Sequence, residues 1–424
     1  VFYTSSQTNC IFGNPALSNG ITVSNSANAG WIGVIDTDWN KGGNWCGGLI
    51  PTAVSDLSIN SGTPFVPVLT STGFVRNLSI GAGGSFSLIG AVAFNVAGDL
   101  SNSGSFIASS LASVNFVGSA LQTIGGTSNT SFFNMNLNSA AGISFATPQT
   151  VFGSINFNNS AADIASNGNL IIGSNASGTG RIGVLQAGNL ITGNVTVQNF
   201  MGGKVNARYL SFAVQNAPIS QLQSSIWVTG SGSGFDSPAF LPTVYTYNET
   251  VAGSINFGKT RATSTAQTFT PGLGYEVLVR SRSLPSNETR AATTMPGVTL
   301  AVSGPLNQGN ITIPVTYRNN GNVTADGWNL IGNPYPSQID WDAATGWTKT
   351  NINSSIYFLD PGSSLTTVTS ALAQSYTYVP AVGCIPAAAG CSGLISQGQG
   401  FYIKAVSYTH LRAHETKANL VCRL

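Results

Sequence analysis

Short alternating segments such as Ser85-Phe-Ser-Leu88, Val114-Asn-Phe-Val117 and Ser154-Ile-Asn-Phe157 recur between Asp56 and Thr229, and Gly, Asn or Ser residues bound each one. Alternation of apolar and polar residues is the pattern of a β-strand with one buried face. Because the segments return with a loose period of about 20 residues, the sequence predicts stacked structural repeats. The connections are too short to hold the crossover helices of a βαβ protein.

A parallel β-solenoid, also called a β-helix, is the fold that this repetition favours. Each coil of such a fold buries its apolar side chains against the neighbouring coils. Asn and Ser suit the corners, because they tolerate tight conformations and bond to the local backbone. An array of β-sandwiches would give similar short strands and is the alternative fold. We expect these residues to face inward: Leu78, Ile80, Leu100, Phe116, Leu137, Ile155 and Leu170.

The composition excludes several classes of protein. Only 7% of the 424 residues are charged, whereas 42% are hydrophobic, which does not fit a charged, disordered chain. The formal net charge of +2 is too small for electrostatic binding of nucleic acid, which needs clustered Lys and Arg. No apolar run reaches the roughly 18 residues of a transmembrane helix, so we predict no membrane span.

The sequence changes in character after the linker-like run Gly230-Ser-Gly-Ser-Gly234. Longer strands with more Pro and aromatic residues, such as Asn310-Ile-Thr-Ile-Pro-Val-Thr-Tyr317, predict an antiparallel β-sandwich. Within it, Pro271-Gly-Leu-Gly-Tyr-Glu-Val277 resembles Gln397-Gly-Gln-Gly-Phe-Tyr-Ile403. We therefore expect one element, a tight turn that leads into a strand, to occur twice in this domain.

The chain is thus expected to be an all-β protein with four parts. Residues 1–50 are an N-terminal cap segment with a Trp-rich motif, 51–230 the solenoid repeats, 231–406 the β-sandwich domain and 407–424 a segment of foreign composition. This last segment resembles a translated sequencing-adapter read-through, of the kind that ends truncated genes in metagenomic assemblies. We interpret it as an artefactual, non-native tail that adds nothing to the core.

Leaving out residues 407–424 also reduces the kinds of catalytic and metal site that the chain could form. Three of the 16 basic and one of the 14 acidic residues lie there, which leaves 13 of each, and both histidines lie there as well. A chain without histidine has no Ser-His-Asp triad, no Cys-His dyad and no His-liganded zinc. Chemistry based on Lys, carboxylates or calcium remains open.

Three stretches resemble parts of large, secreted Bacteroidetes-type cell-surface proteins with β-repeats. The run from Trp39 to Pro51, followed by Asp56 and Ile59, resembles their N-terminal signature. Gly327-Trp-Asn-Leu-Ile-Gly-Asn-Pro-Tyr-Pro336, followed by Ile339-Asp-Trp341, resembles a hallmark of their C-terminal β domain, and Ile395–Ile403 is similar to the last strand of that domain. Together with the repeats, the resemblance covers nearly all of residues 30–405.

This resemblance implies an exported, adhesin-like protein. Members of the group are typically substrates of type IX secretion and carry a C-terminal sorting domain, which here would lie beyond Ala405 in a truncated gene. The resemblance implies a secreted or cell-surface location, a structural or adhesive role without a catalytic site, and surface glycans or other cell-surface proteins as partners. It implies no cofactor.

Two other functions compete with this one. Many β-helices are polysaccharide lyases or hydrolases, which would need carboxylates such as Asp56, Asp99 and Asp163 to converge. A glycan-binding module is the second alternative, because four aromatic residues could either form a sugar-stacking platform or fill a sandwich core. These four residues are Trp328, Tyr335, Trp341 and Trp347.

Oxygen-bearing side chains suggest two candidate metal sites, and calcium is the ion that such ligands favour. Asp36, Asp38 and Asn40 alternate before Gly42, as a calcium loop begins, but Gly47 stands where the closing Glu would be. Asp340 and Asp342 flank Trp341 and would point the same way in an extended chain, as an ion site or an acid pair requires. Turn and cap hydrogen bonds are the alternative role for all of these side chains.

A phosphate-binding motif is present only as a pattern. Gly253-Ser-Ile-Asn-Phe-Gly-Lys-Thr260 matches the P-loop, which needs a buried parallel strand before it and a helix after it. The residues around it predict a strand and a turn, so we expect no nucleotide site there.

The cysteines outside the tail indicate disulfides in an oxidising compartment. Cys384 and Cys391 enclose six residues rich in turn formers, a spacing compatible with a disulfide. Cys10 and Cys46 are the other intrachain pair that remains. Relatives of the group often carry a second Cys just before the Arg-Asn-Leu that spans 76–78, where this chain has Val75, so the pairing of Cys46 stays open.

Overall fold

A computed structural model describes residues 28–203, 205–237, 241–251, 258–287, 295–319, 325–359, 375–385, 392–406 and 417–422. The chain divides into two compact units. The first contains residues 1–173 and 180–194, and the second contains residues 174–179 and 195–424.

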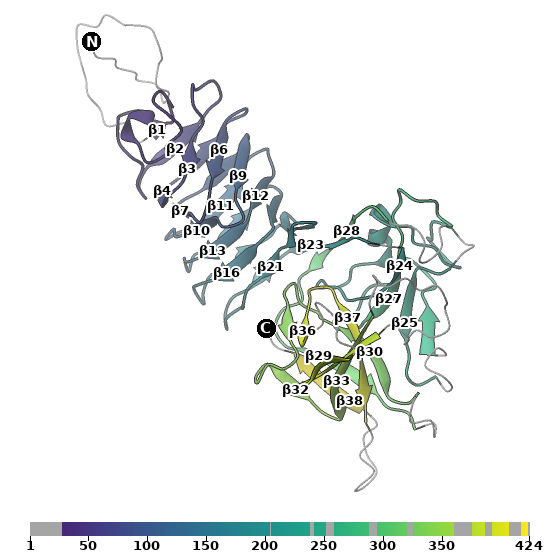
Figure 1. Ribbon diagram of the computed structural model, residues 1–424. Helices are drawn as coiled ribbons and strands as arrows, with labels where there is room; N and C mark the ends of the chain where they lie inside the picture. Colours follow the sequence, from purple (N-terminus) through teal and green to yellow (C-terminus); the bar gives the residue numbers. More distant parts are fainter. Residues whose placement is uncertain are drawn as a thin grey trace, which may run out of the picture. The chain divides into compact units, whose positions relative to one another are not determined.

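The first unit is a parallel β-solenoid of about seven coils, as the repeats predict (Figure 1). One face is the sheet β1 (Asn28–Gly30), β2 (Asp56–Ile59), β5 (Leu78–Ile80), β8 (Leu100–Asn102), β11 (Gln122–Gly125), β14 (Ile143–Phe145), β17 (Ile164–Ala165) and β22 (Ile191–Thr192). The second face is the sheet β4 (Gly73–Val75), β7 (Ala93–Val96), β10 (Ser113–Phe116), β13 (Asn134–Leu137), β16 (Ser154–Phe157) and β21 (Arg181–Ile182).

Shorter strands form the third face of each coil. They are β3 (Val68–Leu69), β6 (Ser85–Leu88) and β9 (Ser105–Ala108), followed by β12 (Thr130–Phe132), β15 (Gln149–Val151) and β18 (Leu170–Ile172). They form two separate parallel ladders, β3-β6-β9 and β12-β15-β18, in which Phe86 stands opposite Phe106 and Val151 opposite Ile172. Like residues therefore stack on like residues along the solenoid axis.

The apolar positions of these strands point inward, which confirms the predicted core. Leu78, Ile80, Leu100, Phe116, Leu137, Ile155 and Leu170 are all buried. Aromatic rings form a column inside the coils, because Phe86 lies 5.8 Å from Phe106 and Phe106 lies 5.6 Å from Phe132 between ring centroids. This column is the solenoid counterpart of a conventional hydrophobic core.

The N-terminal coil is closed by the Trp-rich motif around the 3-10 helix η1 (Gly42–Asn44). Trp39 stacks on Phe86 with ring centroids 4.5 Å apart, and Trp45 meets both Trp31 and Trp39 edge to face. Trp45 Nε1 donates to the Trp39 carbonyl oxygen at 2.7 Å. The rings cover apolar side chains that would otherwise face water at the end of the coil stack.

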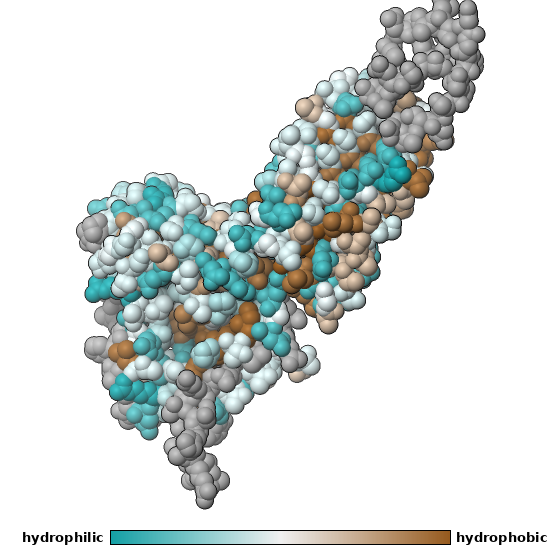
Figure 2. Space-filling model, turned by 180° about the vertical axis from the view of Figure 1, so that it is seen from behind, coloured by the Kyte–Doolittle hydropathy of each residue, from teal (hydrophilic) through white to brown (hydrophobic). Residues whose placement is uncertain are grey.

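The surface of the solenoid is mostly of intermediate hydropathy. Figure 2 shows pale atoms over much of this unit, with brown apolar patches among them. The outward positions of the first face carry mainly Ser and Thr, among them the exposed Ser79, Ser101 and Thr123. Some outward positions are apolar instead, such as Leu49 and Ile107.

The second unit is built from antiparallel sheets, as predicted for the C-terminal half. One sheet has the order β24 (Asn206–Leu210), β27 (Tyr275–Val279), β25 (Val244–Tyr247) and β26 (Lys259–Arg261). Another has the order β30 (Trp328–Gly332), β37 (Gly400–Ala405), β33 (Ile352–Leu359), β34 (Ser375–Val379) and β35 (Gly383–Ile385). In both sheets, the strand that comes first in the chain pairs with the last one. The last strand also pairs with the second, and the second pairs with the third.

The two similar sequence segments occupy equivalent places in these two sheets. Tyr275 of β27 stands opposite Leu210, and Phe401 of β37 stands opposite Ile331. The first glycines of the two turns, Gly272 and Gly398, have φ values of 77° and 71°, which a residue with a side chain adopts only at a cost. The expected repetition of one turn-and-strand element is thus present, and it extends to the whole sheet.

Each of these turns pairs with the other sheet rather than with its own. Leu273 forms an antiparallel bridge with Ile331, and Gln399 forms the equivalent bridge with Leu210. The backbone of Gly332 donates to the Gly272 carbonyl at 2.9 Å, and that of Ser211 donates to the Gly398 carbonyl at 2.9 Å. A reciprocal exchange of turns therefore joins the two sheets.

Further short elements complete the second unit. They are the hairpin β19 (Ser174–Asn175) and β20 (Gly178–Thr179), β23 (Asn194–Met201), the 3-10 helix η2 (Ile219–Ser224), β28 (Val298–Pro305), β29 (Ile311–Thr316), β31 (Ile339–Asp340), β32 (Trp347–Lys349) and β36 (Leu394–Ile395). Among the described residues, none of the helices has the length and apolar character of a membrane span.

The division between the units lies earlier in the chain than the expected boundary at residue 230. Residues 206–210 have the apolar alternation of a solenoid strand, but they form β24 and pair antiparallel with β27. β24 belongs to the second unit because its pairing partner, β27, lies there, although β27 is distant in the sequence.

The segment 407–424, which we expect to add nothing to the core, does contain a strand. Residues 417–422 form β38 (Lys417–Cys422), which pairs antiparallel with β29 and with β32. The sequence Lys-Ala-Asn-Leu-Val-Cys alternates in polarity, as a strand does, and β38 is the middle strand of the sheet β29-β38-β32. Residues 407–416 and 423–424 lie outside the described residues, and the foreign origin of the segment stays a prediction.

The core of the solenoid makes a quantitative prediction. We expect Phe116→Ala to lower the free energy of unfolding by about 3–5 kcal/mol, because it removes a fully buried ring from a stack of coils. Ser79→Ala on the exposed face is the control and should change stability by less than about 0.5 kcal/mol. Urea denaturation measures both, and equal stability of the two variants would contradict the inward position of Phe116.

Candidate functional site

The Trp-Asn-Leu-Ile-Gly-Asn-Pro-Tyr-Pro motif begins as the strand β30. Trp328 and Leu330 share one face of it and pack with Tyr209 and Tyr402. Ile331 points to the opposite face, into a separate core cluster. The strand ends at Gly332, before the Asn-Pro step, as expected of a proline that cannot donate to the sheet.

Asn333 holds the chain where it leaves the strand. Its side chain is fully buried, and its Nδ2 donates to the carbonyl oxygens of Ser337 at 2.6 Å, Ile395 at 3.2 Å and Ser396 at 3.1 Å. Its Oδ1 accepts from the backbone N–H of Tyr335 at 2.9 Å. One amide thus fixes the start of the loop and the approach to β37, so the motif has a structural role.

The aromatic platform suggested by the sequence does not form an open sugar-binding surface. Trp328, Tyr335 and Trp341 are 7%, 0% and 0% exposed, and they belong to the core clusters of the second unit. Trp347 is half-buried and packs edge to face against Trp341 at 5.0 Å. Sugar stacking needs a free ring face. The predicted sugar platform is therefore wrong, and these aromatic residues pack within the second unit.

Asp340 and Asp342 have partners within the protein instead of forming an ion site. Asp340 Oδ1 accepts from the backbone N–H of Asp342 at 2.9 Å, and Asp342 Oδ2 accepts from the Tyr378 hydroxyl. The hydrogen bond to Asp342 raises the pKa of Tyr378 to about 12, since ionisation would break it. These carboxylates therefore act as turn and strand contacts.

The Asp36, Asp38 and Asn40 group is likewise used internally. Asp36 Oδ2 forms an ion pair with Lys41 at 2.6 Å, and its Oδ1 accepts from Asn44 Nδ2 at 2.7 Å. Asp38 Oδ1 caps the backbone N–H of Asn40 at 2.9 Å. The hydrogen bond from Lys41, helped by that from Asn44, lowers the pKa of Asp36 to about 2. Asp36 is thus balanced by Lys41, and both carboxylates of the loop are engaged in its own turn hydrogen bonds.

The solenoid carboxylates considered for catalysis bind the backbone of neighbouring coils. Asp99 Oδ1 accepts from the Thr123 N–H at 2.7 Å, and Asp163 Oδ1 accepts from the Leu190 N–H at 2.8 Å. Asp56 pairs with Arg76, and this hydrogen bond lowers its pKa. No group of three or more His, Cys, Asp or Glu residues that could hold a metal ion occurs in the described part of the chain.

The P-loop pattern falls partly outside the described residues, which exclude 252–257. Lys259 and Thr260, at its end, lie in the strand β26. Lys259 Nζ forms an ion pair with Glu276 on β27 at 2.6 Å. The strand context agrees with the expectation of a strand and turn at this place.

Two of the cysteines are in disulfides. Cys46 and Cys384 are both disulfide-bonded. Cys10 and Cys391, which the sequence suggests as their partners, lie outside the described residues, so the pairing itself stays a prediction.

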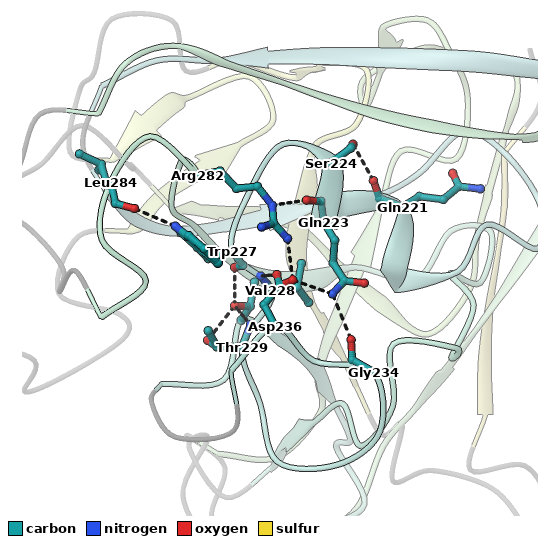
Figure 3. Close-up of polar contacts among 11 residues, drawn as sticks. Gln221, Gln223, Ser224, Trp227, Val228, Thr229, Gly234, Asp236, Arg282 and Leu284 are labelled. Atoms are coloured by element: carbon teal, nitrogen blue, oxygen red, sulfur yellow. Dashed lines mark hydrogen bonds and ion pairs between the residues drawn. The ribbon is translucent and has the colours of Figure 1, made fainter.

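A polar cluster surrounds Trp227, and it was not predicted from the sequence (Figure 3). The Arg282 guanidinium lies 4.6 Å from the centre of the Trp227 ring, and its Nη2 pairs with Asp236 Oδ1 at 2.6 Å. Gln223 Nε2 donates to the same oxygen at 3.0 Å, and Trp227 Nε1 donates to the Leu284 carbonyl at 2.8 Å. Gln223, Trp227 and Asp236 lie close together in the sequence, but Arg282 comes 46 residues after Asp236, so no local motif marks the cluster.

The contacts of this cluster indicate what it does. Asp236 Oδ2 accepts from the backbone N–H of Val228 at 2.8 Å, and Gln223 Nε2 also donates to the Gly234 carbonyl at 3.0 Å. Each polar group is thus used to join η2, the loop around Gly234 and the turn after β27. The cluster is a clamp between loops of the second unit.

A buried carboxylate, that of Glu249, also joins separate segments of the backbone beside β30. Glu249 is 5% exposed, and its Oε1 accepts from the backbone N–H groups of Arg318 at 2.6 Å and Gly327 at 3.0 Å. Burial, together with the charge of Glu249, raises the pKa of the neighbouring Tyr247 to about 12. Glu249 therefore holds the backbone at Arg318 and at Gly327, just before β30.

Comparison with known proteins gives one match. A family model described as Domain of unknown function (DUF8693) matches residues 122–419. No curated protein and no solved structure matches the chain.

The burial of Trp328 predicts a loss of stability when the ring is removed. We expect Trp328→Ala to lower the free energy of unfolding by about 3–5 kcal/mol, whereas Trp328→Phe, which keeps an aromatic ring in the cluster, should cost less. Chemical denaturation followed by circular dichroism measures this difference. An unchanged stability of Trp328→Ala would show that the ring is not part of the core.

Asn333 allows a sharper test, because carboxylate and amide have nearly the same shape. In Asn333→Asp an oxygen would face three carbonyl oxygens, while Asn333→Ala would leave those carbonyls without a donor, at about 1–3 kcal/mol for each unsatisfied group. We expect Asn333→Asp to melt at a lower temperature than Asn333→Ala at neutral pH. The opposite order would contradict the assigned orientation of the amide.

Proposed function

Because the chain belongs to the family described as Domain of unknown function (DUF8693), we propose its function from its architecture: an exported, adhesin-like structural protein of the cell surface, without a catalytic site of its own. The solenoid would serve as a spacer, and the antiparallel unit would present or anchor it. The observation that carries the proposal is the combination of disulfide-bonded cysteines with a solenoid of low charge.

Disulfides support an extracytoplasmic location. Cys46 and Cys384 are bonded, one in each unit, and disulfides persist mainly in oxidising compartments such as the cell exterior. The resemblance of the Trp39–Pro51 and Gly327–Pro336 stretches to Bacteroidetes-type surface proteins supports export by the type IX route.

The arrangement of side chains supports a structural role. The carboxylates of the solenoid cap strands of adjacent coils, and the polar clusters of the second unit join loops. These groups are engaged in the contacts that hold the fold together. A β-solenoid propagates its length coil by coil, which suits a spacer between a cell and its surroundings.

Surface labelling of the cells that carry the gene tests this proposal. An antibody against the folded protein should label intact cells, and external protease should remove the label. A cytoplasmic protein, labelled only after permeabilisation, is the control. If this protein also needs permeabilisation to be labelled, it is not displayed on the surface and the proposal fails.

A further inference from the structure

One outward column of the solenoid consists almost entirely of asparagine. Phe74 on β4 stands opposite Asn95 on β7, Asn95 opposite Asn115 on β10, Asn115 opposite Asn136 on β13, and Asn136 opposite Asn156 on β16. The strands that carry this column lie in consecutive coils (Figure 1). All four asparagines are half-buried, so one edge of each amide faces the surrounding water.

The four amides are joined in a chain of hydrogen bonds. Asn115 Nδ2 donates to Asn95 Oδ1 at 2.9 Å, Asn136 Nδ2 to Asn115 Oδ1 at 2.7 Å, and Asn156 Nδ2 to Asn136 Oδ1 at 2.8 Å. An amide has two N–H donors and an oxygen with two lone pairs. In the middle of the chain, each amide uses one donor and one lone pair for its neighbours, and the others are available for a ligand.

A second row of amides runs beside the first. Asn138 and Asn158 are exposed and lie two residues beyond Asn136 and Asn156 on the same sides of their coils. Asn158 Nδ2 donates to Asn138 Oδ1 at 2.6 Å. The two rows together present uncharged donors and acceptors on neighbouring coils.

An aromatic ring closes the first row at its N-terminal end. Phe74 is 43% exposed, although a ring of this size gains by burial. Rings with a free face stack on the C–H faces of sugars, while amides bond to their hydroxyl groups. Adjacent strands lie about 4.7–4.9 Å apart, so the ring and the amides recur at regular intervals along the axis.

We propose that the outward face of β4, β7, β10, β13 and β16 binds a neutral, extended polysaccharide that runs along the solenoid axis. Phe74 would stack on one sugar ring, and Asn115, Asn136 and Asn138 would bond to hydroxyl groups of successive sugars. A polymer can engage several amides at once, which compensates for the weakness of each contact. This inference rests on the proposed adhesin-like role, because it names the class of ligand that the protein would hold.

Affinity electrophoresis and pull-down with cellulose, chitin and xylan test the proposal, with polygalacturonate as a charged probe. We expect the full chain to bind at least one neutral polymer, and Phe74→Ala combined with Asn138→Ala to weaken that binding by about tenfold or more. Both residues are exposed, so the thermal midpoint should not change. The matched control is Ile107→Ala, which removes an exposed apolar side chain from the third face.

Several results would overturn the inference. They are the absence of binding to all three neutral polymers, a preference for polygalacturonate, and an equal loss of binding in the Ile107→Ala control. The surface labelling described above is independent of glycan binding, so a displayed protein that binds no polymer would refute this inference alone. A protein that binds the polymer but is not displayed would refute only the proposed location.

Discussion

Parallel pairing of each coil with the next is the constraint on which the first unit depends. Because the pairing is in register, a residue in one coil meets the equivalent residue of the neighbouring coil, as Phe86 meets Phe106 and Asn115 meets Asn136. Apolar residues then form a continuous interior, and amides form continuous rows outside. The same register makes carboxylates such as Asp99 into caps for the adjacent coil.

The second unit is held together by contacts between its two related sheets. Two sheets of equal strand order exchange their Gly-containing turns, and the second glycine of each turn allows close approach of the partner backbone. A Cβ on Gly274 would lie 2.5 Å from the Ile331 carbonyl oxygen, and one on Gly400 would lie 2.9 Å from the Leu210 nitrogen. The repeated Gly-x-Gly-aromatic pattern in the sequence thus encodes a tertiary contact as well as a local turn.

Much of this architecture could be predicted from the sequence, because period-two alternation and frequent turn residues are local signals. The inward residues of the solenoid and the repeated turn are of this kind. The end of the solenoid could not be placed, since β24 alternates like its predecessors and only its distant partner β27 makes it antiparallel. The clamp could not be predicted because its ion pair joins Asp236 to Arg282, 46 residues further along the chain, and the burial of Trp328 and Trp341 depends on clusters assembled from several strands.

The exchange of turns also affects how the second unit folds and unfolds. Each of its two related sheets is bridged by the turn that leads into the last strand of the other sheet, since Leu210 pairs with Gln399 and Ile331 with Leu273. The duplicated halves are therefore a single cooperative folding unit, and separating the chain between them would leave each half with an unsatisfied strand end. During synthesis, the earlier half cannot reach its final state until almost all of the second unit has emerged, because Tyr209 and Tyr247 pack against Tyr402.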